Sequence, residues 1–221
     1  MRIRIRTQAH SSPSSRISLK PTTLQIRQRP LRVLDFDIEN RPLSYLGSDF
    51  TTGEVTAISW AWCDKPDDVT VYLLGETELP EILRVFCEVY AQADMVTGHF
   101  IIGHDLPMLN GALMEYQMPP LGDKMVQDTK VHLIRRKGIS CSQESLGAMF
   151  RLDHAKVQMN QIKWRAANRL TPEGLALVRE RVTGDVKQHM AMRKELLALG
   201  YLSHPKMWRS GAVGADTTYT P

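Results

Sequence analysis

The sequence predicts an α/β fold in which a mixed five-stranded sheet carries helices on both faces. Three strand-like segments follow one another with short connections, and two further strand-like segments then alternate with helical ones. Short connections favour antiparallel neighbours, whereas a helical crossover favours parallel ones. With 221 residues the chain is long enough for one such domain with a substantial core, and it shows no internal repeat.

The predicted strands are runs of apolar and β-branched residues bounded by turn-forming residues. The first is apolar enough to be central in the sheet, and the second follows a turn-rich loop. In order, the predicted strands are residues 31–38, 55–62, 69–74, 95–98 and 124–128.

The predicted helices combine apolar residues at helical spacing with start signals. Thr77 is a candidate cap for a first helix that has Pro80 in its first turn. A second helix is expected near residues 105–116. After the last strand the remaining chain is predicted to be helical, ending in a long helix opened by Thr171 and Pro172.

The positive charge is concentrated at the N-terminus. Residues 1–30 hold seven of the 28 Lys and Arg side chains and no Asp or Glu, which leaves residues 31–221 with 21 basic and 24 acidic side chains. The first segment is also rich in Ser and punctuated by Pro, so we predict a basic, flexible arm over 1–30 and a folded domain over 31–221. The arm could contact the phosphates of a nucleic acid, be a solvated tail or cloning artefact, or be an organelle presequence.

Hydropathy and cysteine usage argue against several broad classes. No stretch approaches the roughly 20 consecutive apolar residues that a membrane-spanning helix needs. The three cysteines are far apart and form no CxxC pair, which argues against a disulfide framework and a zinc site. We therefore expect a cytoplasmic protein with reduced thiols.

Two acidic residues stand at the end of the first predicted strand. Residues two apart on a strand project to the same side, so Asp37 and Glu39 share one side of this strand. Two neighbouring carboxylates repel each other, and a divalent cation is a common reason to keep both ionised. The pair predicts a metal site.

Two further acids lie in apolar settings. Asp105 is at a predicted strand-to-helix junction, where a helix N-cap is the alternative to a metal ligand. Asp185 lies on or beside the apolar stripe of the last predicted helix. An ionised carboxylate there needs a cation, a metal or a hydrogen-bond donor as its partner.

In chain order, the three motifs VLDFDIE, GHFIIGHDLP and VTGDV resemble those of the DEDD superfamily of 3′–5′ exonucleases, over about residues 31–197. The branch they resemble is the proofreading-exonuclease-like domains of family B DNA polymerases. The resemblance implies a ribonuclease H-like fold and hydrolysis at nucleic-acid 3′ ends, of DNA in preference to RNA, with two Mg²⁺ or Mn²⁺ ions. It also implies that Asp37 bridges both ions. Glu39 and Asp185 would bind the ion that activates water, and Asp105 would reach the second ion.

The third motif departs from the family pattern. Where the family carries a Tyr four residues, or a His five residues, before the final Asp, this chain has Arg181 and Glu180. A guanidinium stays protonated and cannot act as a base, so Arg181 is expected to pair with a site carboxylate or hold a phosphate oxygen. His189, one turn after Asp185, is a candidate displaced base, with an ordinary partly buried histidine as the alternative.

Three further residues are candidates for contact with a substrate. Asn40 and Arg41 follow Glu39 directly and are expected to meet the nucleotide end. His104 stands where the family usually has Phe or Tyr, and it could contact a phosphate or line the edge of the site.

The same residues allow two other functions. A ribonuclease H-like endonuclease or resolvase would cut circular substrates internally. A non-catalytic nucleic-acid-binding or protein-binding module would bind without metal-dependent hydrolysis.

Overall fold

The computed structural model describes residues 29–43, 51–153 and 157–211. By its contacts the chain divides after Pro30, and Leu31–Pro221 forms one compact unit that holds the described helices and strands. The arm over residues 1–30 stays a prediction, since 1–28 lie outside the described residues.

A six-stranded mixed sheet forms the centre of this unit, in the order β3-β2-β1-β4-β5-β6. The central strand β1 pairs antiparallel with β2 and parallel with β4. The β2–β3 and β5–β6 pairs are antiparallel, and β4–β5 is parallel. The strands are β1(Val33–Pro42), β2(Gly53–Trp62), β3(Thr70–Leu73), β4(Met95–Gly98), β5(Lys124–Asp128) and β6(Lys206–Trp208).

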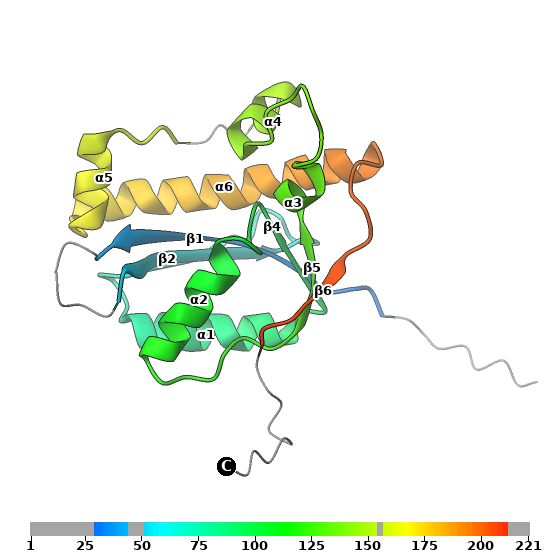
Figure 1. Cartoon of the computed structure of the whole chain (residues 1–221). Coiled ribbons are helices and arrows are strands. Elements are labelled where there is room, and N and C mark those ends of the chain that lie inside the picture. Colours follow the sequence, from blue (N-terminus) through cyan, green and yellow to red (C-terminus); the bar gives the residue numbers. More distant parts are fainter. Residues whose placement is uncertain (1–28, 44–50, 154–156, 212–221) are drawn as a thin grey trace, which may run out of the picture. The chain divides into compact units, whose positions relative to one another are not determined.

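Helices cover both faces of the sheet, as predicted (Figure 1). One face carries α1 and α2, and the other carries the long helix α6, with α5 packed against its N-terminal part. The helices are α1(Leu79–Gln92), α2(Asp105–Glu115), α3(Thr129–Leu133), α4(Gln143–Met149), α5(Gln161–Asn168) and α6(Pro172–Ala198).

The predicted count of five strands is wrong by one. The sixth strand, β6, lies in a segment that was expected to be helical, and it pairs with the edge of β5. Three residues are too few to show either a strand or a helix periodicity, and the pairing is set by the neighbouring strand.

Of the two helix-start predictions, one is confirmed and one is wrong. Thr171 caps α6, its hydroxyl accepting the N–H of Gly174 at 3.1 Å, as predicted. Thr77 does not cap α1, because that helix begins at Leu79 with Glu78 in the N-cap position and no side-chain cap. Thr77 instead forms a single bridge with Leu74.

Strand β1 has one apolar face and one acidic face. Leu34, Phe36 and Ile38 are buried in the core formed with α1 and α2. Residues of the other parity, Asp35 and Asp37 among them, project toward α6 because strand side chains alternate between the two faces. Elsewhere α6 packs on the sheet through apolar contacts, which involve Ala57, Ala61, Leu73, Val178, Val182, Val186 and Met190.

Two further predictions concern the membrane and the thiols. Among the described residues no helix is long and apolar enough to cross a membrane. Cys63, Cys87 and Cys141 are all free and half-buried, as expected.

Gly174 lets α5 lie close to α6. A methyl group at this position would come within 2.3 Å of the Ala166 carbonyl oxygen, which belongs to the backbone of α5. Replacement by alanine therefore requires a shift of a whole helix rather than of one side chain.

We expect Gly174→Ala to lower the free energy of unfolding by about 1–3 kcal/mol, the usual cost of overpacking. The matched control is Gly111→Ala in α2, where an added methyl group would meet no atom within 4 Å. That change should raise the free energy of unfolding by up to about 1 kcal/mol, because alanine favours the helix. Urea unfolding measures both values, and equal effects of the two changes would contradict the close contact.

Candidate metal centre

Helix α6 runs antiparallel to β1 across its acidic face, and the spacings of the two elements match. Residues four apart on a helix are about 6 Å apart along its axis, and residues two apart on a strand are about 6.6 Å apart. Successive acids of β1 therefore meet successive turns of α6 in three facing pairs. The pairs are Asp35 with His189, Asp37 with Asp185, and Glu39 with Arg181.

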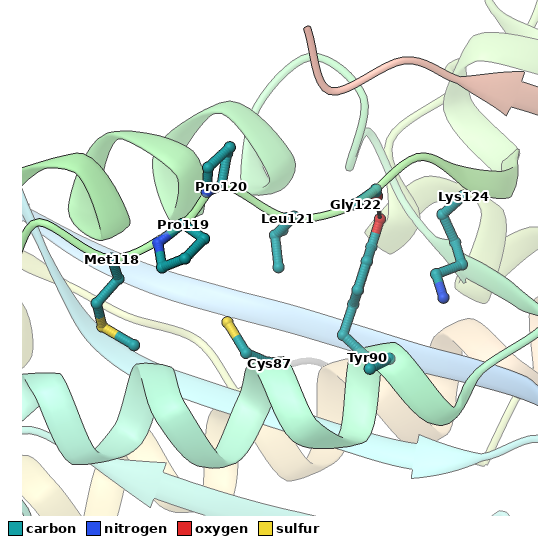
Figure 2. Close-up of a pocket in the computed structure, with 9 residues that line it drawn as sticks. Cys87, Tyr90, Met118, Pro119, Pro120, Leu121, Gly122 and Lys124 are labelled. Atoms are coloured by element: carbon teal, nitrogen blue, oxygen red, sulfur yellow. Dashed lines mark hydrogen bonds between the residues drawn. The ribbon is translucent and has the colours of Figure 1, made fainter. Parts of the chain in front are cut away.

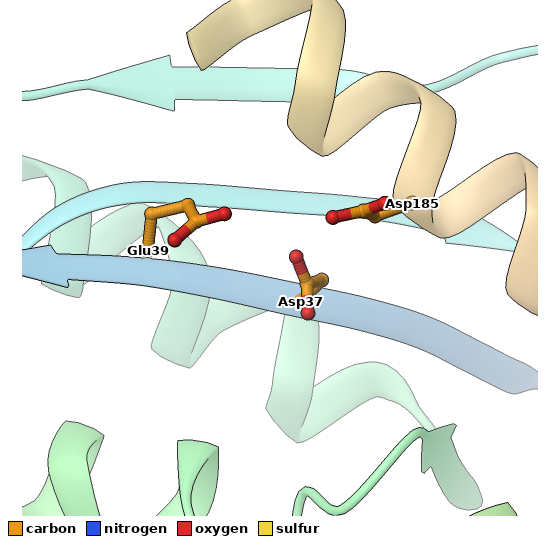
Figure 3. Close-up of side chains that lie close together, drawn as sticks. All are labelled: Asp37, Glu39 and Asp185. Carbon is orange, nitrogen blue, oxygen red and sulfur yellow. The ribbon is translucent and has the colours of Figure 1, made fainter. Parts of the chain in front are cut away.

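Three of the four predicted metal ligands come together at this place. Asp37 and Glu39 project from β1, and Asp185 faces them from α6 (Figure 3). Each offers a carboxylate oxygen, and these oxygens lie within 4.8 Å of one another. Asp185 is buried, whereas Asp37 and Glu39 are half-buried. We call these three residues the carboxylate cluster.

Asp105, the fourth predicted ligand, lies against the backbone of β1 rather than in the carboxylate cluster. Its Oδ1 accepts the N–H of Ile38 at 3.1 Å, beyond the point where β1 stops pairing with β4. The helix N-cap alternative does not hold, because His104 occupies that position and Asp105 is the first residue of α2. Asp105 is thus buried beside the peptide that links Asp37 to the following residue.

The loop that carries Asp105 is held by Asp128, an acid that sequence reasoning missed. The Asp128 carboxylate accepts the N–H groups of Phe100 at 3.0 Å, Ile102 at 2.9 Å and Val131 at 3.0 Å. Phe100 has a φ of 75°, a left-handed conformation that is unfavourable for a bulky residue. The Asp128 hydrogen bonds offset this strain and fix the start of α2.

Arg181 lies among the acids of the carboxylate cluster. Its Nε forms an ion pair with Glu39, and its Nη2 is 3.7 Å from Asp185 Oδ2. Its Nη1 donates to the Val157 carbonyl at 3.1 Å, and its guanidinium lies 5.2 Å from the centre of the Trp164 ring. Burial alone would lower the pKa of Arg181, but the neighbouring carboxylates outweigh burial and raise it.

His189 is buried and bonded at both ring nitrogens. Its Nδ1 lies 2.5 Å from Asp35 Oδ2, and its Nε2 lies 3.0 Å from the Thr129 hydroxyl. That hydroxyl also contacts His99 Nδ1 at 2.9 Å. Both ring nitrogens of His189 are thus engaged within the protein, and its role as a displaced base stays a prediction.

Asp35 is the acid in this region that sequence reasoning overlooked. It is fully buried, and burial raises its pKa against the opposing effect of His189. The signal was present, because Asp35 has the same strand parity as Asp37 and Glu39.

The predicted substrate contacts lie near the end of β1 and at the start of α2. Arg41 is engaged within the protein, since it forms an ion pair with Glu54 at 2.6 Å and donates to the Asn168 carbonyl at 2.6 Å. Asn40 follows a bulge in the β1–β2 pairing and is half-buried. His104 has a side chain that is 45% exposed, and its pKa is raised by the adjacent Asp105.

The chemistry of the donor set suits a hard divalent cation. Mg²⁺ and Mn²⁺ prefer carboxylate oxygens, and metal–oxygen distances of about 2.0–2.6 Å are usual for hard cations. Oxygens within 4.8 Å of one another can all reach one ion placed between them. The carboxylate cluster could therefore bind a metal ion.

A separate pocket of about 470 Å³ lies on the other face of the sheet, between α1 and the segment before β5 (Figure 2). Tyr90 lines this pocket, and its hydroxyl donates a hydrogen bond to the Gly122 carbonyl at 2.9 Å. None of its lining residues is a predicted site residue, and they carry no cluster of acids.

Comparison with known proteins supports the fold. No family model and no curated protein matches the sequence. The chain is similar to the solved structure of the family B DNA polymerase from the hyperthermophilic archaeon Pyrobaculum calidifontis, with a TM-score of 0.60 and 16% identity. The match covers 78% of this chain and 25% of the polymerase chain. At this identity the likeness shows the fold alone, and the predicted ribonuclease H-like α/β fold is confirmed.

We expect His189→Ala to lower the free energy of unfolding by about 3–5 kcal/mol, because it leaves the Asp35 carboxylate buried without its partner. The control is His104→Ala, which removes a half-exposed histidine next to an Asp and should cost less than about 1 kcal/mol. Urea unfolding measures both. Similar losses for the two variants would contradict a stabilising role for the buried pair.

Proposed function

We propose that this chain is a metal-dependent 3′–5′ exonuclease that hydrolyses phosphodiester bonds at nucleic-acid 3′ ends, of DNA in preference to RNA. The observation that carries the proposal is the carboxylate cluster, which two elements far apart in the sequence bring together on a ribonuclease H-like sheet. The order of the three acidic motifs along the chain supports it.

Each acid has a role in this proposal. Asp37, Glu39 and Asp185 would hold a divalent ion. Asp105, at the start of α2, would act at the part of the site where the substrate binds. When bound, such an ion would supply an activated water and offset the negative charge that develops on the phosphate and the leaving oxygen. The Arg181 guanidinium, which can only donate, would orient Glu39 and Asp185.

The proposed reaction is a simple hydrolysis. The oxygen of a water molecule bonds to the phosphorus of the terminal phosphodiester, and the bond from phosphorus to the 3′ oxygen of the preceding nucleotide breaks. One water proton passes to that leaving oxygen, and the other is released from the new phosphate monoester to solvent. The products are a nucleoside 5′-monophosphate and a strand shorter by one nucleotide.

A non-catalytic nucleic-acid-binding module is the second candidate, and one observation favours it. Arg181 already supplies a positive partner to two of the three clustered carboxylates, so the acids have a counter-ion within the chain. Such a module would bind nucleic acid and leave it intact.

We expect single-stranded DNA labelled at its 5′ end to give a ladder of shortened products with Mg²⁺ or Mn²⁺, and none with EDTA. The 3′-labelled strand should release labelled mononucleotide first. RNA of the same sequence should be degraded more slowly, and covalently closed circles should stay intact. Internal cuts in the circles would point to an endonuclease instead.

We expect Asp37→Asn and Asp185→Asn to lower the rate of this reaction by more than about 100-fold. Even the loss of a residue that only hydrogen-bonds to a metal ligand typically lowers metal affinity or activity by about 10–100-fold. The control is Asp67→Asn, which removes one carboxylate at a side chain that is 94% exposed. It should keep the wild-type rate. Undiminished hydrolysis by Asp37→Asn would overturn the proposal, and strand binding without hydrolysis by the wild type would favour the binding module.

A further inference from the structure

We infer that Arg181 is a built-in cation of the carboxylate cluster, and that the cluster therefore holds one divalent ion where the family resemblance implies two. This inference rests on the proposed metal centre. It concerns how many ions that centre takes and which residue decides the number.

The guanidinium contacts the carboxylates that a second ion would need. Arg181 forms its ion pair with Glu39 through Nε, and its Nη2 points toward Asp185 at 3.7 Å. These two acids are the ones that the family resemblance assigns to the water-activating ion. One positive group thus already spans two of the three ligands.

Arg181 is held in this position by three further constraints. Its side chain is only 13% exposed, so it is packed rather than free in solvent. Its Nη1 donates to the Val157 carbonyl, and its guanidinium lies over the Trp164 ring. Trp164 belongs to α5, which Gly174 allows to pack directly against α6. A guanidinium held by this many contacts cannot swing away without breaking several of them.

With Arg181 paired to Glu39 and Asp185, the oxygens of the carboxylate cluster suit a single ion. Three oxygens within 4.8 Å of one another match the span across a single ion with ligands at about 2.0–2.6 Å. Asp105, which the family resemblance assigns to the second ion, lies outside that group and accepts the Ile38 N–H through Oδ1. A second ion would therefore have to share Glu39 and Asp185, which Arg181 already holds. A second divalent ion would also be repelled by the fixed positive charge of Arg181.

The experiment counts bound Mn²⁺ by electron paramagnetic resonance and by calorimetric titration of the metal-free protein. We expect one Mn²⁺ per wild-type chain and two per chain for Arg181→Gln. The matched control is Arg179→Gln, which removes a positive charge from the same helix at a surface ion pair with Glu76. It should bind one Mn²⁺ with unchanged affinity.

A second variant, Arg181→Lys, keeps the positive charge and guards against misfolding of Arg181→Gln. It should bind one Mn²⁺ as the wild type does, and circular dichroism reports whether each variant is folded. Two ions in the wild type, or one in a folded Arg181→Gln, would overturn the inference and leave the proposed nuclease intact. No Mn²⁺ binding by the wild type, or binding that Asp37→Asn leaves unchanged, would overturn both.

Discussion

The antiparallel packing of α6 across β1 is the constraint on which the rest of this structure depends. It places a row of three strand residues, Asp35, Asp37 and Glu39, against one face of a helix. At one end of the row Glu39 forms an ion pair with Arg181, and at the other end Asp35 is hydrogen-bonded to His189. In the middle Asp37 faces another acid, Asp185, so two like charges meet. A divalent ion at this middle position would offset their repulsion, which is why the metal site is proposed there.

One face of β1 stabilises the fold, and the other carries the acidic residues. Leu34, Phe36 and Ile38 join the main core, which holds the strand in the centre of the sheet. The other face can then carry acids because apolar contacts on either side of them, such as Ala57 with Val182 and Ala61 with Val186, fix the helix. The buried His189–Asp35 pair adds a polar contact that sets the helix in register with the strand.

Much of this could be predicted from the sequence, where the signals are local. The bounds of β4 and β5 match the predicted ones, as does the capped start of α6. Strand parity identified Asp37 and Glu39 as neighbours, and the apolar stripe identified Asp185 as an acid in need of a partner.

The remaining features depend on contacts between distant segments. The hydrogen bond from the Ile38 backbone to Asp105 and the pairing of His189 with Asp35 join elements more than 60 residues apart, so no local pattern shows them. Asp35 could have been found, because its parity with Asp37 and Glu39 is visible in the sequence.

The most direct test of a cation site between the facing acids is a crystal structure of the protein soaked in Mn²⁺, with anomalous data collected at the manganese edge. The predicted result is an anomalous peak between Asp37, Glu39 and Asp185, at about 2.0–2.6 Å from a carboxylate oxygen of each. Fully occupied peaks at surface acids with none between these three side chains would contradict it.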